Sequence, residues 1–183
     1  MQHQSDRPFD HRPSGLPERF GPTVFALVLL VLTIFFTVNV VSTPWLDYLE
    51  SSTTYYLLGF CDHSGCHDYA GLNSPFRDVF PQSYGLGLIA LALAGVELVF
   101  LVLSIFGKRV AFGILFSGIL SSSTLLLAAL YFYFGVLVKM SREPWATGRG
   151  WFAAFLVVSF LLMATIIGFF AERARNPALA SRD

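Results

Sequence analysis

Residues 22–41, PTVFALVLLVLTIFFTVNVV, decide the fold class of this chain. The segment holds 20 residues and no charged side chain, and a helix needs about 20 apolar residues to cross the hydrocarbon core of a bilayer. A signal peptide is the alternative interpretation, but the apolar run is long for one and no small-x-small cleavage site follows it. We therefore interpret this segment as the first transmembrane helix.

Three further apolar segments, at residues 84–106, 110–136 and 151–170, have the same character. Backbone groups in lipid must be satisfied within the segment, so each of them is expected to be a helix. The composition agrees, because 55% of the 183 residues are hydrophobic and only 13% are charged. The sequence thus predicts an all-α membrane protein, a four-helix transmembrane bundle over residues 21–170 with an outer loop at 42–83.

The distribution of basic residues predicts the orientation, since Lys and Arg concentrate on the cytoplasmic side. One side carries eight of them: Arg7, Arg12, Arg19, Lys108, Arg109, Arg173, Arg175 and Arg182. The other carries four: Arg77, Lys139, Arg142 and Arg149. We expect a plasma-membrane protein with cytoplasmic tails at 1–20 and 171–183, and with an acidic first loop outside.

The outer loop contains the signals of a small β-hairpin. Residues 53–60 are rich in β-branched and aromatic side chains, which favours a strand, and Asp62-His63-Ser64-Gly65 is typical turn chemistry. The two cysteines, Cys61 and Cys66, flank this turn. Because an extracellular compartment is oxidising, we expect them to form a disulfide that clips the hairpin.

Other chemistry at these positions is less consistent with the pattern. Cys61, His63, Cys66 and His67 are all zinc-type ligands, but their spacing is cramped for one ion and oxidised cysteines supply no thiolates. Thiol redox enzymes use a C-x-x-C pair, which this chain lacks. We expect no metal and no cofactor. His63 and His67 could titrate near neutral pH and sense it, although solvated loop histidines are the simpler interpretation.

The outer loop resembles that of the claudin superfamily. The resemblance rests on the four-helix topology, on Pro44-Trp45 just after the first helix, and on Gly59-Phe60-Cys61 followed by Cys66. Trp45, Gly59 and Phe60 are the signature positions besides the cysteines. The chain looks most similar to the fungal SUR/PalI branch, through Ser42-Thr43-Pro44-Trp45 and the stretch from Tyr56 to Cys61. Membership would imply plasma-membrane organisation or ambient-pH signalling.

Glu97 is the one charged residue inside the second apolar segment. An ionised acid in lipid is costly, so Glu97 should face the bundle interior. Counting from the Gly107-Lys108-Arg109 turn places it level with Ser117 to Ser121, whose hydroxyls are its expected partners. Two interpretations remain open: interhelical hydrogen bonding, or a proton or cation site.

These observations predict a non-enzymatic membrane organiser. The sequence shows no nucleophile–base pair and no phosphate-binding loop, so we expect neither an enzyme nor a small-molecule substrate. The zero formal net charge gives no sign of a nucleic-acid partner. The expected partners are the lipid bilayer and either a second copy of the chain or another integral membrane protein. The alternative is a proton or cation conductor or pH sensor that uses Glu97 or the outer-loop histidines.

Overall fold

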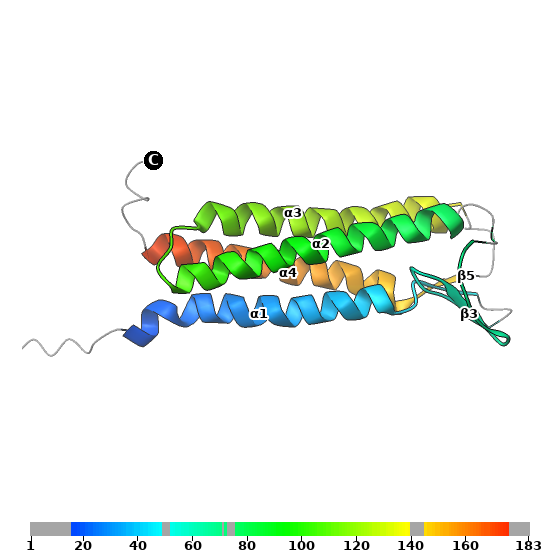
Figure 1. Ribbon diagram of the computed structural model, residues 1–183, viewed down its shortest axis with the longest axis horizontal. Helices are drawn as coiled ribbons and strands as arrows, with labels where there is room; N and C mark the ends of the chain where they lie inside the picture. Colours follow the sequence, from blue (N-terminus) through cyan, green and yellow to red (C-terminus); the bar gives the residue numbers. More distant parts are fainter. Residues whose placement is uncertain (1–15, 49–51, 71, 73–75, 140–144, 176–183) are drawn as a thin grey trace, which may run out of the picture.

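Four long helices form an elongated bundle, and a small sheet lies at one end of it (Figure 1). The computed structural model describes residues 16–48, 52–70, 72, 76–139 and 145–175. The helices are α1 (Leu16–Ser42), α2 (Phe76–Ile105), α3 (Ala111–Phe132) and α4 (Arg149–Arg175). All four are long and apolar enough to cross a membrane. This confirms the predicted multi-pass four-helix bundle.

Small residues bring the helices close together along the bundle axis. Helix α3 packs between α2 and α4, and α1 packs mainly against α4. Side chains added at Gly118 and Gly168 would collide with neighbouring helices. Alanines fill the same interior: Ala26, Ala90, Ala94, Ala128 and Ala164 are all 0–1% exposed. Without a hydrophobic force between helices in lipid, such close van der Waals packing is the main source of bundle stability.

The helix ends extend beyond the apolar segments that predicted them. Helix α2 begins at Phe76 rather than 84, because Val79 and Phe80 are buried under the sheet and hold the extra turns in place. Helix α1 begins at Leu16 and α4 continues to Arg175, so parts of both predicted tails are helical. Residues 1–15 and 176–183 of those tails lie outside the described residues. Helix α3 continues into a π-helical turn, η1 (Tyr133–Leu137).

The sheet has five short antiparallel strands in the order β4-β3-β2-β1-β5. The strands are β1 (Leu46–Tyr48), β2 (Thr53–Tyr55), β3 (Phe60–Asp62), β4 (Gly65–His67) and β5 (Trp145–Thr147). The expected hairpin at the cysteines is present as β3–β4. A continuous strand over 53–60 was wrong, because the chain turns back between β2 and β3. The fifth strand comes from the segment between α3 and α4, so both connections at this end share one sheet.

Trp45 anchors the sheet to the bundle. It is 1% exposed, and its indole nitrogen donates a hydrogen bond of 2.9 Å to the Val40 carbonyl at the end of α1. Its ring packs edge-on against Phe132 of α3 at a centroid distance of 5.1 Å. Gly150, at the start of α4, leaves no room for a side chain against the same ring. A single aromatic residue therefore contacts three helices.

Candidate functional site

The β3–β4 hairpin carries the predicted disulfide. Cys61 and Cys66 are opposite each other in the strand register, and their sulfur atoms are 2.02 Å apart. The bond uses both thiolates that a zinc site at these positions would need. Among the described residues, no group of three potential metal ligands is found. The hairpin is therefore a covalently closed element at the edge of the sheet.

Polar side chains of the turn form a small network at the tip of this hairpin. The Ser64 backbone N–H and hydroxyl donate to Asp62 Oδ1 at 2.7 and 2.6 Å. The Ser64 hydroxyl is also 3.0 Å from Nε2 of His67, and that nitrogen lies 3.6 Å from Asp62 Oδ1. The Ser64 hydrogen bonds, together with nearby His67, lower the pKa of Asp62. His63 is exposed at the tip. The structure thus brings one of the two predicted pH-sensing histidines, His67, against an acid.

Gly59 and Phe60 shape the turn that connects β2 to β3. A side chain at Gly59 would overlap the His67 carbonyl, so only glycine lets β4 lie so close. Phe60 stacks between Tyr55 and Tyr69, at centroid distances of 5.6 and 6.2 Å. The Tyr69 hydroxyl donates to the carbonyls of Tyr56 and Gly59, and burial raises its pKa well above the usual value. The signature positions thus have structural roles here.

Glu97 faces the bundle interior, as predicted, but its partner lies on a different helix. The side chain is 0% exposed, and Oε1 is 2.9 Å from the hydroxyl of Thr165 on α4. Its second oxygen, Oε2, has no hydrogen-bond partner among the described residues. The expected bond to Ser117 or Ser121 was wrong.

The register of α2 and α3 explains this error. The Ser121 hydroxyl donates to the Ala90 carbonyl of α2 at 2.7 Å, and Ser117 bonds to Gly113 within its own helix at 2.6 Å. With Ser121 level with Ala90, Glu97 lies level with about Ile114. The prediction assumed that the two helices pair symmetrically about their connection, residues 106–110, whereas the observed pairing is offset from that count by about five residues. The two serines are therefore nearer to the sheet than Glu97 is.

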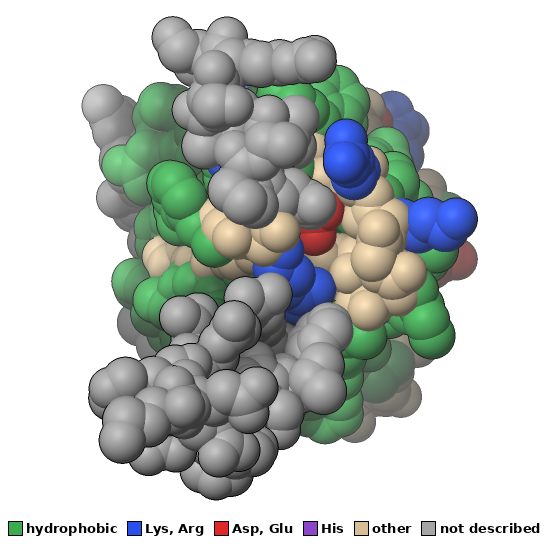
Figure 2. Space-filling model, turned by 90° about the vertical axis from the view of Figure 1, so that its left-hand side faces the viewer, with side chains coloured by type: hydrophobic (Ala, Val, Ile, Leu, Met, Phe, Trp, Pro, Cys, Tyr) green, Lys and Arg blue, Asp and Glu red, His purple; other side chains and the backbone are tan. Residues whose placement is uncertain are grey.

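A second buried acid was missed because it lies beyond the last apolar segment. Glu172 of α4 is 1% exposed and accepts a hydrogen bond from Ser104 of α2. Arg175 donates to the Ser104 carbonyl at 3.1 Å and to the Thr23 hydroxyl of α1. Figure 2 views this end of the molecule and shows basic side chains beside an acidic one. Continued helical spacing from Thr165 to Glu172 was the only sequence signal for this contact.

These features define the class of protein: a multi-pass membrane bundle with interhelical polar contacts and a disulfide-clipped sheet at one end. No protein-family model matches the chain, and no curated protein is significantly similar to it. The resemblance to the claudin superfamily and its SUR/PalI branch therefore stays a prediction from the outer-loop residues.

Proposed function

We propose that this chain is a non-enzymatic organiser of the plasma membrane, with its sheet outside and both termini in the cytoplasm. It would act by lateral association with a second copy or with another integral membrane protein. The β3–β4 hairpin carries this proposal. It forms one edge of the sheet, and Figure 1 shows it projecting beyond the end of the bundle.

The edge strand β4 is suited to contact with a neighbouring chain. All three of its residues are exposed, and it is the terminal strand of the sheet. Edge strands present unpaired backbone groups that a strand of another protein can join. The disulfide and the Tyr69 hydrogen bonds hold the hairpin in one shape, so little ordering entropy would be lost on contact.

The polar contacts inside the bundle favour an organiser over a conductor. Glu97 and Thr165 bond to each other, and Ser121 bonds to a backbone carbonyl. Glu97 is fully enclosed at 0% exposure, whereas a conducting acid needs contact with water or with a second relay group. These contacts are thus typical of the interhelical hydrogen bonds that hold membrane helices together.

Site-specific crosslinking tests the association. A photo-crosslinking amino acid at His63, at the hairpin tip, should give a discrete crosslinked species in native membranes, and its mass identifies a second copy or a partner. The same amino acid at Lys108, at the opposite end of the bundle, is the matched control and should give none. The proposal would be contradicted if the His63 position gave no crosslinked species although the probe was incorporated there as well as at Lys108.

A second function, pH sensing by the hairpin, is favoured by one observation. Nε2 of His67 lies 3.6 Å from Asp62 Oδ1 and 3.0 Å from the Ser64 hydroxyl. Protonation of His67 would turn the polar contact with Asp62 into an ion pair and change the charge of the edge strand. If the crosslinking yield from His63 changes between pH 5 and 8, and His67→Gln removes that change, sensing and association are properties of the same hairpin.

A further inference from the structure

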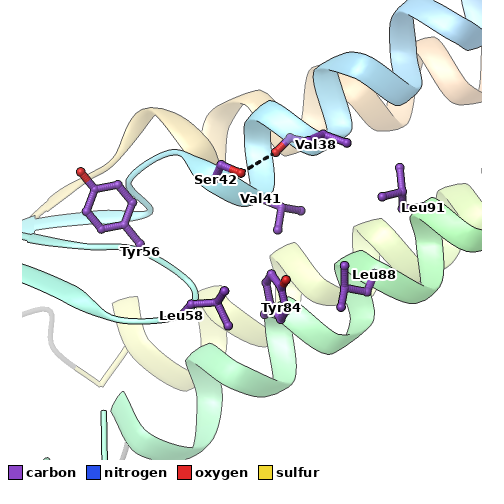
Figure 3. Close-up of a pocket in the computed structure, with 8 residues that line it drawn as sticks. All are labelled: Val38, Val41, Ser42, Tyr56, Leu58, Tyr84, Leu88 and Leu91. Carbon is purple, nitrogen blue, oxygen red and sulfur yellow. Dashed lines mark hydrogen bonds between the residues drawn. The ribbon is translucent and has the colours of Figure 1, made fainter. Parts of the chain in front are cut away.

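A lateral pocket lies between α1 and α2, just beneath the sheet (Figure 3). Its volume is about 310 Å³, at the lower end of the range for small-molecule sites. The lining residues are Val38, Val41, Ser42, Tyr56, Leu58, Tyr84, Leu88 and Leu91. Because the pocket lies at the sheet end of two membrane-spanning helices, a molecule would enter it from the bilayer.

The polar and apolar groups of the pocket are separated along the bundle axis. Ser42 and Tyr84 lie near the sheet, while Leu88 and Leu91 line the deeper part (Figure 3). The Tyr84 hydroxyl points into the space between the helices. The Ser42 hydroxyl donates to the Val38 carbonyl at 3.0 Å, which leaves its oxygen able to accept. The order of groups matches a lipid with a polar end at the membrane surface.

The polar end of the pocket is formed by hydroxyl groups alone. None of the eight lining residues is charged, so the pocket offers no cation to pair with a phosphate. A phospholipid headgroup would lose hydration here without an ionic partner, whereas one neutral hydroxyl could both donate and accept. The chemistry therefore favours a lipid whose only polar group is a hydroxyl.

A rigid turn of the sheet covers the outer end of the pocket. Leu58, at the centre of the β2–β3 turn, is 60% exposed and lies beside Tyr84 (Figure 3). The turn is closed by a 2.8 Å bond from the Tyr56 N–H to the Gly59 carbonyl. The Tyr69 hydroxyl bonds to the Gly59 carbonyl and to the Tyr56 carbonyl. Neighbouring Leu57 is fully buried and fixes the direction of Leu58. The cover is thus in place before a ligand arrives.

We propose that this pocket binds a neutral hydroxyl-bearing membrane lipid of the sterol class. The sterol hydroxyl would lie at Tyr84 and Ser42, its rings between Val38 and Leu88, and its alkyl tail in the surrounding bilayer. This site is separate from the hairpin proposed for lateral association, and its test does not depend on that association.

Photolabelling of the full chain in phosphatidylcholine nanodiscs tests the proposal. A diazirine-bearing 3β-hydroxysterol should label the pocket residues saturably, and excess unlabelled 3β-hydroxysterol should compete. Val38→Phe fills the space and should weaken labelling by about tenfold. Val31→Phe is the matched control, because Val31 lies on the same helix and is 49% exposed against 47% for Val38, yet it is outside the pocket lining.

Tyr84→Phe removes only the hydroxyl group, so it distinguishes sterol binding from nonspecific hydrophobic binding to the pocket. Loss of one hydrogen bond should weaken labelling by about fivefold, and the same change at Tyr133, which is outside the lining, should have no effect. Equal labelling in Val38→Phe and Val31→Phe would overturn the proposal. So would saturable labelling of the pocket by a phosphatidylcholine photoprobe that excess sterol fails to displace, since that would assign the pocket to an acyl chain.

Discussion

Thr165 has one hydroxyl hydrogen and two neighbouring acceptors. Its oxygen is 2.8 Å from the Leu161 carbonyl and 2.9 Å from Glu97 Oε1. One hydrogen cannot serve both bonds well, so the arrangement is completed when Glu97 is a neutral acid that donates its own hydrogen to Thr165. The buried Oε2, which has no partner in the described part of the chain, is also less costly as a carbonyl oxygen than as a carboxylate.

The effect of a substitution at Glu97 on the free energy of unfolding should therefore depend on whether the new side chain can donate a hydrogen bond without carrying a charge. Glu97→Gln keeps a donor for Thr165 and should change the free energy of unfolding by less than about 1 kcal/mol. Glu97→Lys places a cation in the same enclosed position and should cost more than about 2.5 kcal/mol. Unfolding in a detergent or bicelle titration measures both. A Gln variant as unstable as the Lys variant would show that the carboxylate itself is required.

The stability of the turn at the hairpin tip should depend on pH through a single residue, Asp62. The Ser64 hydrogen bonds and His67 lower the pKa of Asp62, so the Asp62 carboxylate stabilises the folded turn above its usual pKa of about 3.9. That contribution is lost as the pH falls through the lowered pKa of the folded state. NMR titration of the Asp62 carboxyl carbon should find the lowered midpoint, and Ser64→Ala should raise it. An unchanged midpoint in Ser64→Ala would contradict this explanation.

At the scale of helices, the contact between α3 and α4 depends on Gly118. A side-chain carbon there would collide with Thr165, so Gly118→Ala should push the helices apart and disturb the Glu97 bond. We expect a loss of about 1–3 kcal/mol in unfolding free energy. Gly95→Ala on α2 is the control, because nothing lies within 4 Å of its added carbon; it should be neutral or stabilising. Equal effects of the two substitutions would show that Gly118 is not a packing contact.

The elements differ in how far the sequence could predict them. Apolar runs of about 20 residues with at most one charge identified all four helices, because spanning a membrane demands such runs. Strand β5 was missed since three residues in a short polar segment carry no periodicity. Glu97 was correctly placed inside the bundle by the cost of burying its charge. Its partner was not predictable, because a shift of a few residues between α2 and α3 changes which hydroxyl is near.

At the scale of the whole molecule, the prediction is which end of the bundle faces the cytoplasm, and thiol labelling tests it. A cysteine at Lys108 should resist an impermeant thiol reagent added outside intact cells, whereas one at Arg77, at the sheet end, should react. Lys108 is preferable to Gly107, whose φ of 77° disfavours any side chain. The two native cysteines are paired and add no background. Labelling of Lys108→Cys with protection of Arg77→Cys would mean that the bundle is inverted.

The sheet is built from two separate connections, so its strands can pair only in a fixed order as the chain is synthesised. Strands β1 to β4 leave the ribosome before α2, whereas β5, the other neighbour of β1, emerges only after α3. During translation, one edge of β1 therefore stays unpaired until β5, about a hundred residues downstream, has been synthesised. The hydrogen bonds from Gly148 to Trp45 and from Gly150 to Pro44 form only after that point as well. Because β5 directly precedes α4, the sheet can close only after the first three helices have been synthesised. Until then, the open sheet exposes an edge strand that a chaperone can recognise.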